Sequence, residues 1–174
     1  MIAGILWQSD TDVISNLVAG MEVLQIGCWQ GHDTAALARE AVRVVTIGQR
    51  PGLDHTGFAD QVSMWAVIQR FYRVADHTLI LQGDLGDLVS SFTPGQFDVA
   101  VIDLTALGSP DPAQMFNLAQ QVASKIIMIP SAFRQFDTYA AGMPALGYTA
   151  EQCGRVWVLD PAPAPEPAET KEED

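Results

Sequence analysis

Short apolar runs alternate with longer amphipathic stretches along the chain, and this alternation predicts strands and helices in turn. The apolar runs are rich in β-branched residues and nearly continuous, at positions 22–26, 42–47, 78–81, 98–102 and 125–129. Strands that are buried on both faces of a parallel sheet have this pattern. Helical patterns lie before and between them, at positions 11–18, 33–41, 57–74, 86–92 and 112–123, and Asp10 is placed to cap the first helix.

The chain continues into two strand-like segments that a very short turn connects. Residues 148–152 and 155–159 flank a turn that contains Gly154, and so short a turn forces antiparallel pairing. The earlier connections are each long enough for a right-handed crossover between parallel strands. The sequence therefore predicts an α/β fold with a Rossmann-like, doubly wound, mostly parallel seven-stranded sheet that ends in an antiparallel hairpin. We expect residues 1–160 to form this single domain, a size that suits one hydrophobic core.

Residues 161–174 differ in composition from the rest of the chain. They alternate proline with alanine and then become acidic, with five acidic residues and one lysine. Such a segment cannot bury apolar surface and favours extended conformations, so we expect a flexible, solubilising tail. An interaction arm is the alternative.

The charge balance limits the partners that we expect. The net charge is −12, of which the tail contributes −4, so the domain is acidic as well, and its seven arginines and one lysine form no dense cluster. An acidic surface repels nucleic acids and anionic membranes, and we expect neither as a partner. No signal peptide or membrane-spanning run is recognisable, which favours a cytoplasmic protein. A homo-oligomer or a protein partner stays open.

The strongest local signal is a glycine-containing turn between the first strand and the helix that follows it. The segment reads Ile26-Gly27-Cys28-Trp29-Gln30-Gly31-His32-Asp33-Thr34 and continues into an Ala/Leu-rich helix. Gly27 permits a tight turn, Gly31 lets a ligand approach the backbone, and the first N–H groups of the helix can bind a polar group. The same glycines would suit a Rossmann-like turn without a ligand.

This pattern, IGxxxGxxT before an Ala/Leu helix, resembles the class I S-adenosylmethionine-dependent methyltransferases, and in particular their small-molecule O-methyltransferase-like branch. The resemblance extends from about residue 11 to residue 159 and includes segments 44–48, 81–85 and 97–103. It implies that S-adenosylmethionine is the cofactor and that a small molecule accepts the methyl group. It also implies a cofactor cleft at the carboxyl ends of the first four strands, where doubly wound sheets bind ligands.

The resemblance assigns roles to positions that follow the strands. The implied cofactor contacts are Gly27, Cys28, Trp29, Gly31, Gly48, Gln49, Asp84 and Leu85. The first four would face the methionine part and the next two the ribose. The last two would face the adenine, where Asp84 would accept a hydrogen bond from the exocyclic amine; capping the short helix that follows is an equal alternative for Asp84. Asp103 would lie beside the methionine end or the acceptor substrate.

Two positions depart from the family's pattern. The family usually has one acidic residue two positions before the first glycine and another at the end of the second strand, whereas this chain has Gln25 and Gly48 there. Glutamine accepts a hydrogen bond but cannot neutralise an ammonium group, and charge-assisted bonds are about twice as strong as neutral ones. We expect each loss to cost about 1–2 kcal/mol of binding free energy, unless Asp54 compensates.

Histidines, cysteines and the segment after the fifth strand bear on the chemistry. His55 is a candidate general base because imidazole titrates near neutral pH, although a lone loop histidine is more often a surface residue. After the fifth strand the chain reads Ile129-Pro130-Ser131-Ala132, without the Asp or Asn ligands that a metal-dependent member would combine with Asp103. The cysteines and histidines show no ligand spacing, so we expect no metal site and no structural disulfide.

Two functions compete for this chain. The first is methyl transfer from S-adenosylmethionine to an oxygen or nitrogen of a small acceptor by in-line displacement, with Asp103 or His55 as the base. The second is a catalytically degenerate methyltransferase-like domain that acts as a binding or assembly module. The glycine turn and Asp84 favour the enzyme, whereas Gln25 and Gly48 favour the module.

Overall fold

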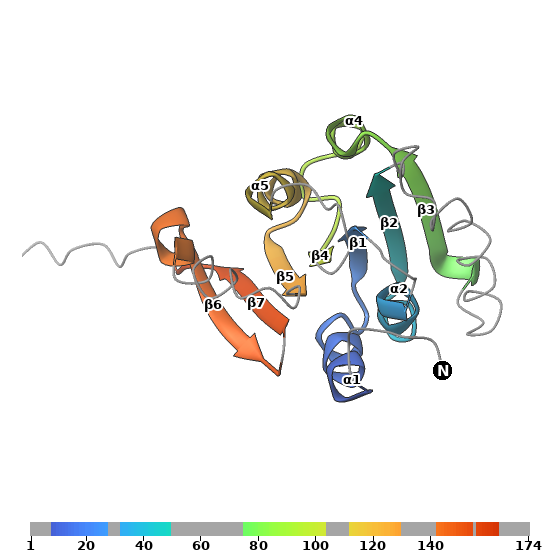
Figure 1. Ribbon diagram of the computed structural model, residues 1–174, viewed down its shortest axis with the longest axis horizontal. Helices are drawn as coiled ribbons and strands as arrows, with labels where there is room; N and C mark the ends of the chain where they lie inside the picture. Colours follow the sequence, from blue (N-terminus) through green and yellow to red (C-terminus); the bar gives the residue numbers. More distant parts are fainter. Residues whose placement is uncertain are drawn as a thin grey trace, which may run out of the picture.

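A seven-stranded sheet forms the centre of the molecule, which a computed structural model describes for residues 8–27, 32–49, 75–103, 112–129, 142–154 and 156–163. The strand order is β3-β2-β1-β4-β5-β7-β6 (Figure 1). In chain order the strands are β1 (Glu22–Ile26), β2 (Arg43–Gln49), β3 (Thr78–Gly83), β4 (Val99–Asp103), β5 (Lys125–Ile129), β6 (Tyr148–Cys153) and β7 (Val156–Pro161). Strands β1 to β5 pair in parallel, whereas β7 pairs antiparallel with β5 and β6. The predicted fold, with its terminal hairpin, is confirmed.

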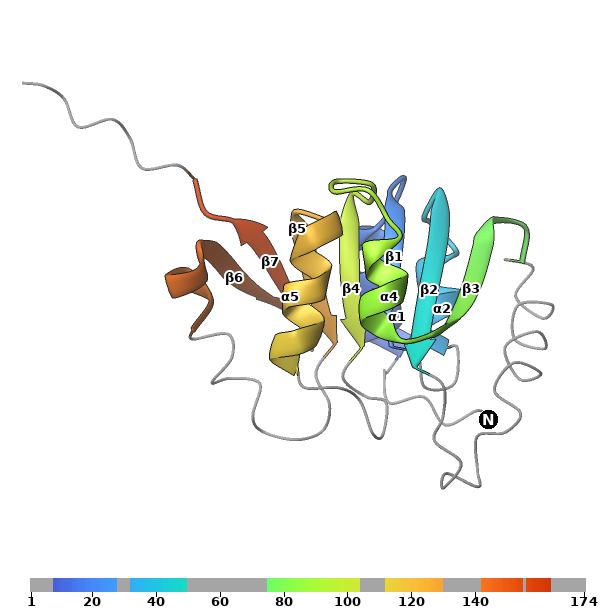
Figure 2. The same cartoon turned by 90° about the horizontal axis from the view of Figure 1, so that it is seen from above.

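Helices cover both faces of this sheet. Figures 1 and 2 show α1 (Gln8–Leu17) and α2 (His32–Leu37) on one face, and α4 (Leu85–Ser90) and α5 (Pro112–Val122) on the other. Two short 3₁₀ helices precede β3 and β6, namely η1 (Ala75–His77) and η2 (Met143–Leu146). None of the helices in the described ranges is long and apolar enough to cross a membrane.

Each central strand contributes to two apolar cores because its side chains alternate between the faces. In β1, Leu24 and Ile26 pack in the cluster under α4 and α5, whereas Val23 packs in the cluster under α1 and α2. All three side chains are fully buried. Burial on both faces explains why the strand sequences show apolar runs rather than an alternation of apolar and polar residues.

The first two helices differ in their bounds from the sequence expectation. Because α1 begins at Gln8, Asp10 lies inside its first turn, and the prediction that Asp10 caps this helix is wrong. Helix α2 ends at Leu37. After it, the hydrogen bonds span three residues instead of four, as in the bond from the Arg39 N–H to the Ala36 carbonyl, and this tighter turn ends the helix. The helix predicted at 57–74 lies outside the described residues.

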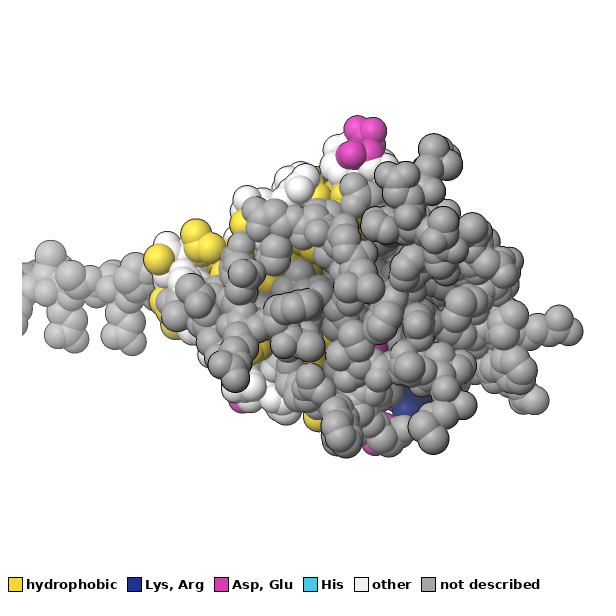
Figure 3. Space-filling model, viewed as in Figure 1, with side chains coloured by type: hydrophobic (Ala, Val, Ile, Leu, Met, Phe, Trp, Pro, Cys, Tyr) yellow, Lys and Arg dark blue, Asp and Glu magenta, His cyan; other side chains and the backbone are white. Residues whose placement is uncertain are grey.

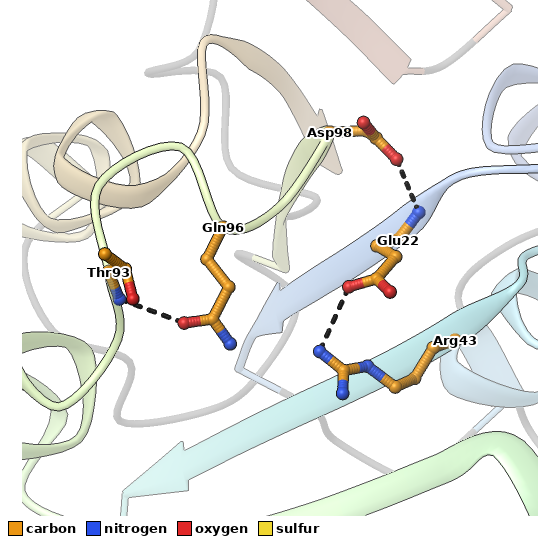
Figure 4. A network of polar contacts seen from close by, with 5 residues as sticks. All are labelled: Glu22, Arg43, Thr93, Gln96 and Asp98. Carbon is orange, nitrogen blue, oxygen red and sulfur yellow. Dashed lines mark hydrogen bonds and ion pairs between the residues drawn. The ribbon is translucent and has the colours of Figure 1, made fainter.

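A polar network anchors the amino-terminal ends of β1, β2 and β4 (Figure 4). The Glu22 N–H donates to Asp98 Oδ2 at 2.8 Å, and the Asp98 N–H donates back to the Glu22 carbonyl at 3.0 Å. Arg43 Nη2 lies 3.0 Å from Glu22 Oε2 in an ion pair. Before β4, the Thr93 N–H donates to Gln96 Oε1 and shapes the preceding turn. These bonds fix the end of the sheet that lies opposite the carboxyl ends of the parallel strands.

Candidate functional site at the carboxyl ends of the strands

The connection order of the strands creates a switch point between β1 and β4. From β1 the chain moves outward to β2 and then β3, and it returns to the other side of β1 to form β4. In open α/β sheets, ligands bind outside the carboxyl ends of the strands at such a point. The parallel strands run toward the lower edge of the sheet in Figure 2, so the candidate site lies at that edge.

The strand registers bring six of the predicted positions to this edge. Ile26 pairs with Ile47 on β2 and with Ile102 on β4. The residues that follow these three, Gly27, Gly48 and Asp103, therefore reach the edge side by side. Gln49 pairs with Gly83 of β3, after which the chain continues into Asp84 and Leu85. Cys28, Trp29, Gly31 and His55 lie outside the described residues.

Gly27 is the point at which the chain leaves the sheet. Its φ angle is +85°, in the left-handed region that side chains with a Cβ rarely adopt. Its N–H donates to the Ile47 carbonyl at 2.9 Å, so the backbone stays tied to β2 until the bend begins. Gly27 thus has the backbone conformation that favours glycine, whereas residues 28–31 of the predicted turn lie outside the described residues.

Gln25 forms a polar cluster inside the sheet, directly before this bend. Its side chain is fully buried, with 0% exposure. Its Oε1 accepts hydrogen bonds from Thr34 Oγ1 at 2.6 Å and from Thr46 Oγ1 at 3.0 Å. Since Thr34 belongs to α2 and Thr46 to β2, one amide oxygen joins three elements at the base of the glycine turn. This role of Gln25 and the two threonines was not predicted from the sequence.

The other end of the same amide has no partner among the described residues. Gln25 Nε2 is buried, and no acceptor within the described ranges lies at hydrogen-bond distance. An unpaired buried donor costs about 1–3 kcal/mol, and most buried side-chain polar atoms in proteins are paired. The candidate site therefore has an unused hydrogen-bond donor close to its floor.

Asp84 caps α4. Its Oδ1 accepts from the N–H groups of Gly86 at 2.9 Å and Asp87 at 3.2 Å, which satisfies two of the donors that a helix start leaves unpaired. The capping role that the sequence left open is thus present. The side chain is exposed, and acidic side chains lie over α4 in Figure 3. Leu85 is only 4% exposed and packs in the core, so its backbone is what it can offer to a ligand.

The described residues contain no group of three or more His, Cys, Asp or Glu side chains that could hold a metal ion. Cys153, on β6, is a free thiol that packs against the core under α1 and α2. The polar groups near the site whose contacts are described include the Gln25 amide, the two threonine hydroxyls and the Asp84 carboxylate. Such a set suits hydrogen bonding to a polar organic ligand.

No protein-family model matches this sequence, and no curated protein matches it significantly. Solved structures do match in fold. A methyltransferase from Geobacter sulfurreducens has a TM-score of 0.66 and 14% identity over 91% of this chain and 80% of that chain. An O-methyltransferase from Bacillus cereus in complex with SAH has a TM-score of 0.64 and 19% identity over 91% of this chain and 83% of that chain.

A third match has a different activity. It is described as precorrin 8w decarboxylase from Methanobacterium thermoautotrophicum, with a TM-score of 0.64 and 16% identity over 90% of this chain and 91% of that chain. One fold thus includes proteins described as methyltransferases and one described as a decarboxylase. At such identities the likeness shows the fold, and the chemistry has to be argued from the site.

Proposed function

We propose that this chain, which has the fold of the class I S-adenosylmethionine-dependent methyltransferases, binds that cofactor and transfers its methyl group to an oxygen or nitrogen of a small acceptor. The observation that carries the proposal is the Gly27 bend at the switch point of the sheet. The structural likeness to an SAH-bound O-methyltransferase supports the same ligand class. When bound, the cofactor would supply a sulfonium-bound methyl group whose carbon a nucleophile can attack in line, with the thioether S-adenosylhomocysteine as the leaving group.

The described residues fit parts of this cofactor. Gln25 Nε2 is a buried donor without a partner among the described residues, and the amino-acid end of the cofactor carries a carboxylate that accepts hydrogen bonds. The Asp84 carboxylate uses Oδ1 for the helix cap, and Oδ2 remains as an acceptor for an exocyclic amine. At the end of β2, Gln49 would contact the ribose through neutral hydrogen bonds.

The protein's contribution to the reaction would be mainly positioning. Gly27 and the Gln25 cluster would fix the floor of the cleft, and a rigid floor holds the reacting atoms at attack distance. Asp103, at the end of β4, would receive the proton from the acceptor hydroxyl or amine as that group attacks. His55 is the alternative base from the sequence analysis.

A non-catalytic binding module is the second candidate, and two observations favour it. The Oε1 atom of Gln25 and the Oδ1 atom of Asp84 both already have partners within the protein. Polar groups that the resemblance implies for the cofactor therefore also stabilise the fold itself. The two functions differ in whether the cofactor binds at physiological concentration.

Calorimetric titration with S-adenosylmethionine and S-adenosylhomocysteine tests the proposal. Saturable binding at about micromolar concentration, some 8 kcal/mol, supports the enzyme. No heat and no thermal shift at about millimolar concentration, some 4 kcal/mol, contradicts the enzyme and leaves the module. A matched variant, Gly48→Asp, places an acid at the expected ribose position and should raise the affinity about tenfold.

A further inference from the structure

The buried amide of Gln25 presents its oxygen to two neighbouring hydroxyl groups and its nitrogen to none among the described residues. Both threonine hydroxyls donate to Oε1, from α2 on one side and from β2 on the other. In the opposite orientation Nε2 would donate to the two hydroxyls, and a buried carbonyl oxygen would be left without a donor instead. The donor that remains has no acceptor among the described residues.

The position of this donor connects it with the candidate site. Gln25 lies two residues before the Gly27 bend, and its partner Thr34 lies in the first turn of the helix that follows the glycine turn. The amide therefore lies at the base of the strand–turn–helix unit, at the switch point where α/β sheets bind ligands. The nitrogen is also shielded from solvent, and a charge-assisted bond is stronger where water is excluded.

We infer that Gln25 is a specificity-determining residue, whose amide nitrogen binds the carboxylate of an amino-acid-bearing nucleoside ligand. This inference rests on the proposed function. An acidic residue at this place would accept a hydrogen bond from the ligand's ammonium group, whereas Gln25 presents a donor and no charge. The chain would thus recognise the carboxylate of the ligand more strongly than its ammonium group.

Two analogues of S-adenosylhomocysteine separate the contact to the ligand's carboxylate from the contact to its ammonium group. One lacks the carboxylate and keeps the ammonium group, and the other lacks the ammonium group and keeps the carboxylate. We expect the wild-type chain to bind the deaminated analogue at least about tenfold more tightly than the decarboxylated one, because one charge-assisted bond contributes about that factor.

The Gln25→Glu variant should reverse this preference. Glutamate has nearly the same shape and can still accept from Thr34 and Thr46, but it presents a carboxylate oxygen in place of Nε2. Gln25→Met removes the donor without adding charge and should bring the ratio of the two dissociation constants close to one. Gln120 is exposed on α5, and Gln120→Glu adds the same single negative charge as Gln25→Glu. This control should leave the ratio of the two dissociation constants as in the wild type.

The outcomes distinguish the inference from the proposed function. If the ratio is the same in the wild type, Gln25→Glu and Gln25→Met, Gln25 does not contact the ligand and the inference is wrong. If the wild type prefers the decarboxylated analogue, the carbonyl faces the ligand and the inference is equally wrong. If S-adenosylhomocysteine itself does not bind at about millimolar concentration, the proposed function fails, and this inference fails with it.

Discussion

The two ends of the parallel strands differ in how their polar groups are paired. At the amino-terminal ends, Glu22 and Arg43 form an ion pair, and Glu22 and Asp98 exchange two hydrogen bonds, one of which goes to the Asp98 carboxylate. Arg43 Nε is buried and has no partner among the described residues. At the carboxyl-terminal ends the described polar cluster is neutral and fully buried, and the Gln25 amide keeps an unpaired donor. Each end thus has one buried donor without a partner among the described residues, and the two ends differ in charge and burial: the first cluster is charged and partly exposed, whereas the second is neutral and buried.

Glycine substitutions give the largest expected contrast between the two ends. Gly27→Ala places a Cβ at a φ of +85°, and Gly20→Ala, before β1, places one at +72°. Each should lower the free energy of unfolding by about 1–2 kcal/mol, because both positions require a left-handed backbone. A Cβ at Gly20 meets nothing within 4 Å, so Gly20→Ala is a matched control for backbone strain alone.

Only Gly27→Ala should also weaken binding of S-adenosylhomocysteine, by about tenfold or more, because it changes the bend at the cleft. Urea unfolding and calorimetry on both variants measure the two effects separately. Equal affinities for the two variants would contradict a ligand site at Gly27.

Asp84 gives an intermediate effect that separates capping from ligand binding. Asp84→Ala removes the cap of α4 and should cost about 1 kcal/mol of stability, whereas Asp84→Asn keeps a capping oxygen and should cost far less. If the carboxylate also binds an adenine amine, both variants should lose affinity for S-adenosylhomocysteine. A loss of affinity in Asp84→Ala alone would show that Asp84 acts on the site only through the helix.

Glu22→Gln should give the smallest effect. The side chains of Glu22 and Arg43 are 41% and 42% exposed, and ion pairs at such positions contribute less than about 1 kcal/mol. The stability difference from the wild type should shrink at about 1 M salt, where screening is strong. Affinity for S-adenosylhomocysteine should not change, and a change would mean that the two ends of the sheet are coupled.

The strands could be predicted because their burial on both faces gives an unusual sequence signal. Segments such as 22–26 and 125–129 are apolar at nearly every position, and both coincide with the observed strands β1 and β5. The hairpin followed from the short turn at Gly154, whose φ is +64°. The strand order was not predicted, because the pairing of β1 with β4 joins segments that lie far apart in the sequence.

The site was only partly predictable because its polar contacts join residues far apart in the sequence. Gln25 and Thr46 are 21 positions apart, and nothing local indicates that Thr46 Oγ1 points at the Gln25 amide. A signal did exist, since Gln25 and Thr46 are polar residues within otherwise apolar strands, and such residues need partners. The roles predicted for Cys28, Trp29, Gly31 and His55 stay predictions.

The neighbouring position of β1 and β4 has a consequence for how the protein is synthesised. Glu22 and Asp98, which join these strands, are 76 positions apart, so β1, β2 and β3 emerge from the ribosome well before β4. Until β4 is added, β1 has an open edge whose side chains are buried in the finished sheet. A nascent or truncated chain that stops before β4 would therefore be prone to aggregate, and the switch point of the sheet would form only when β4 docks.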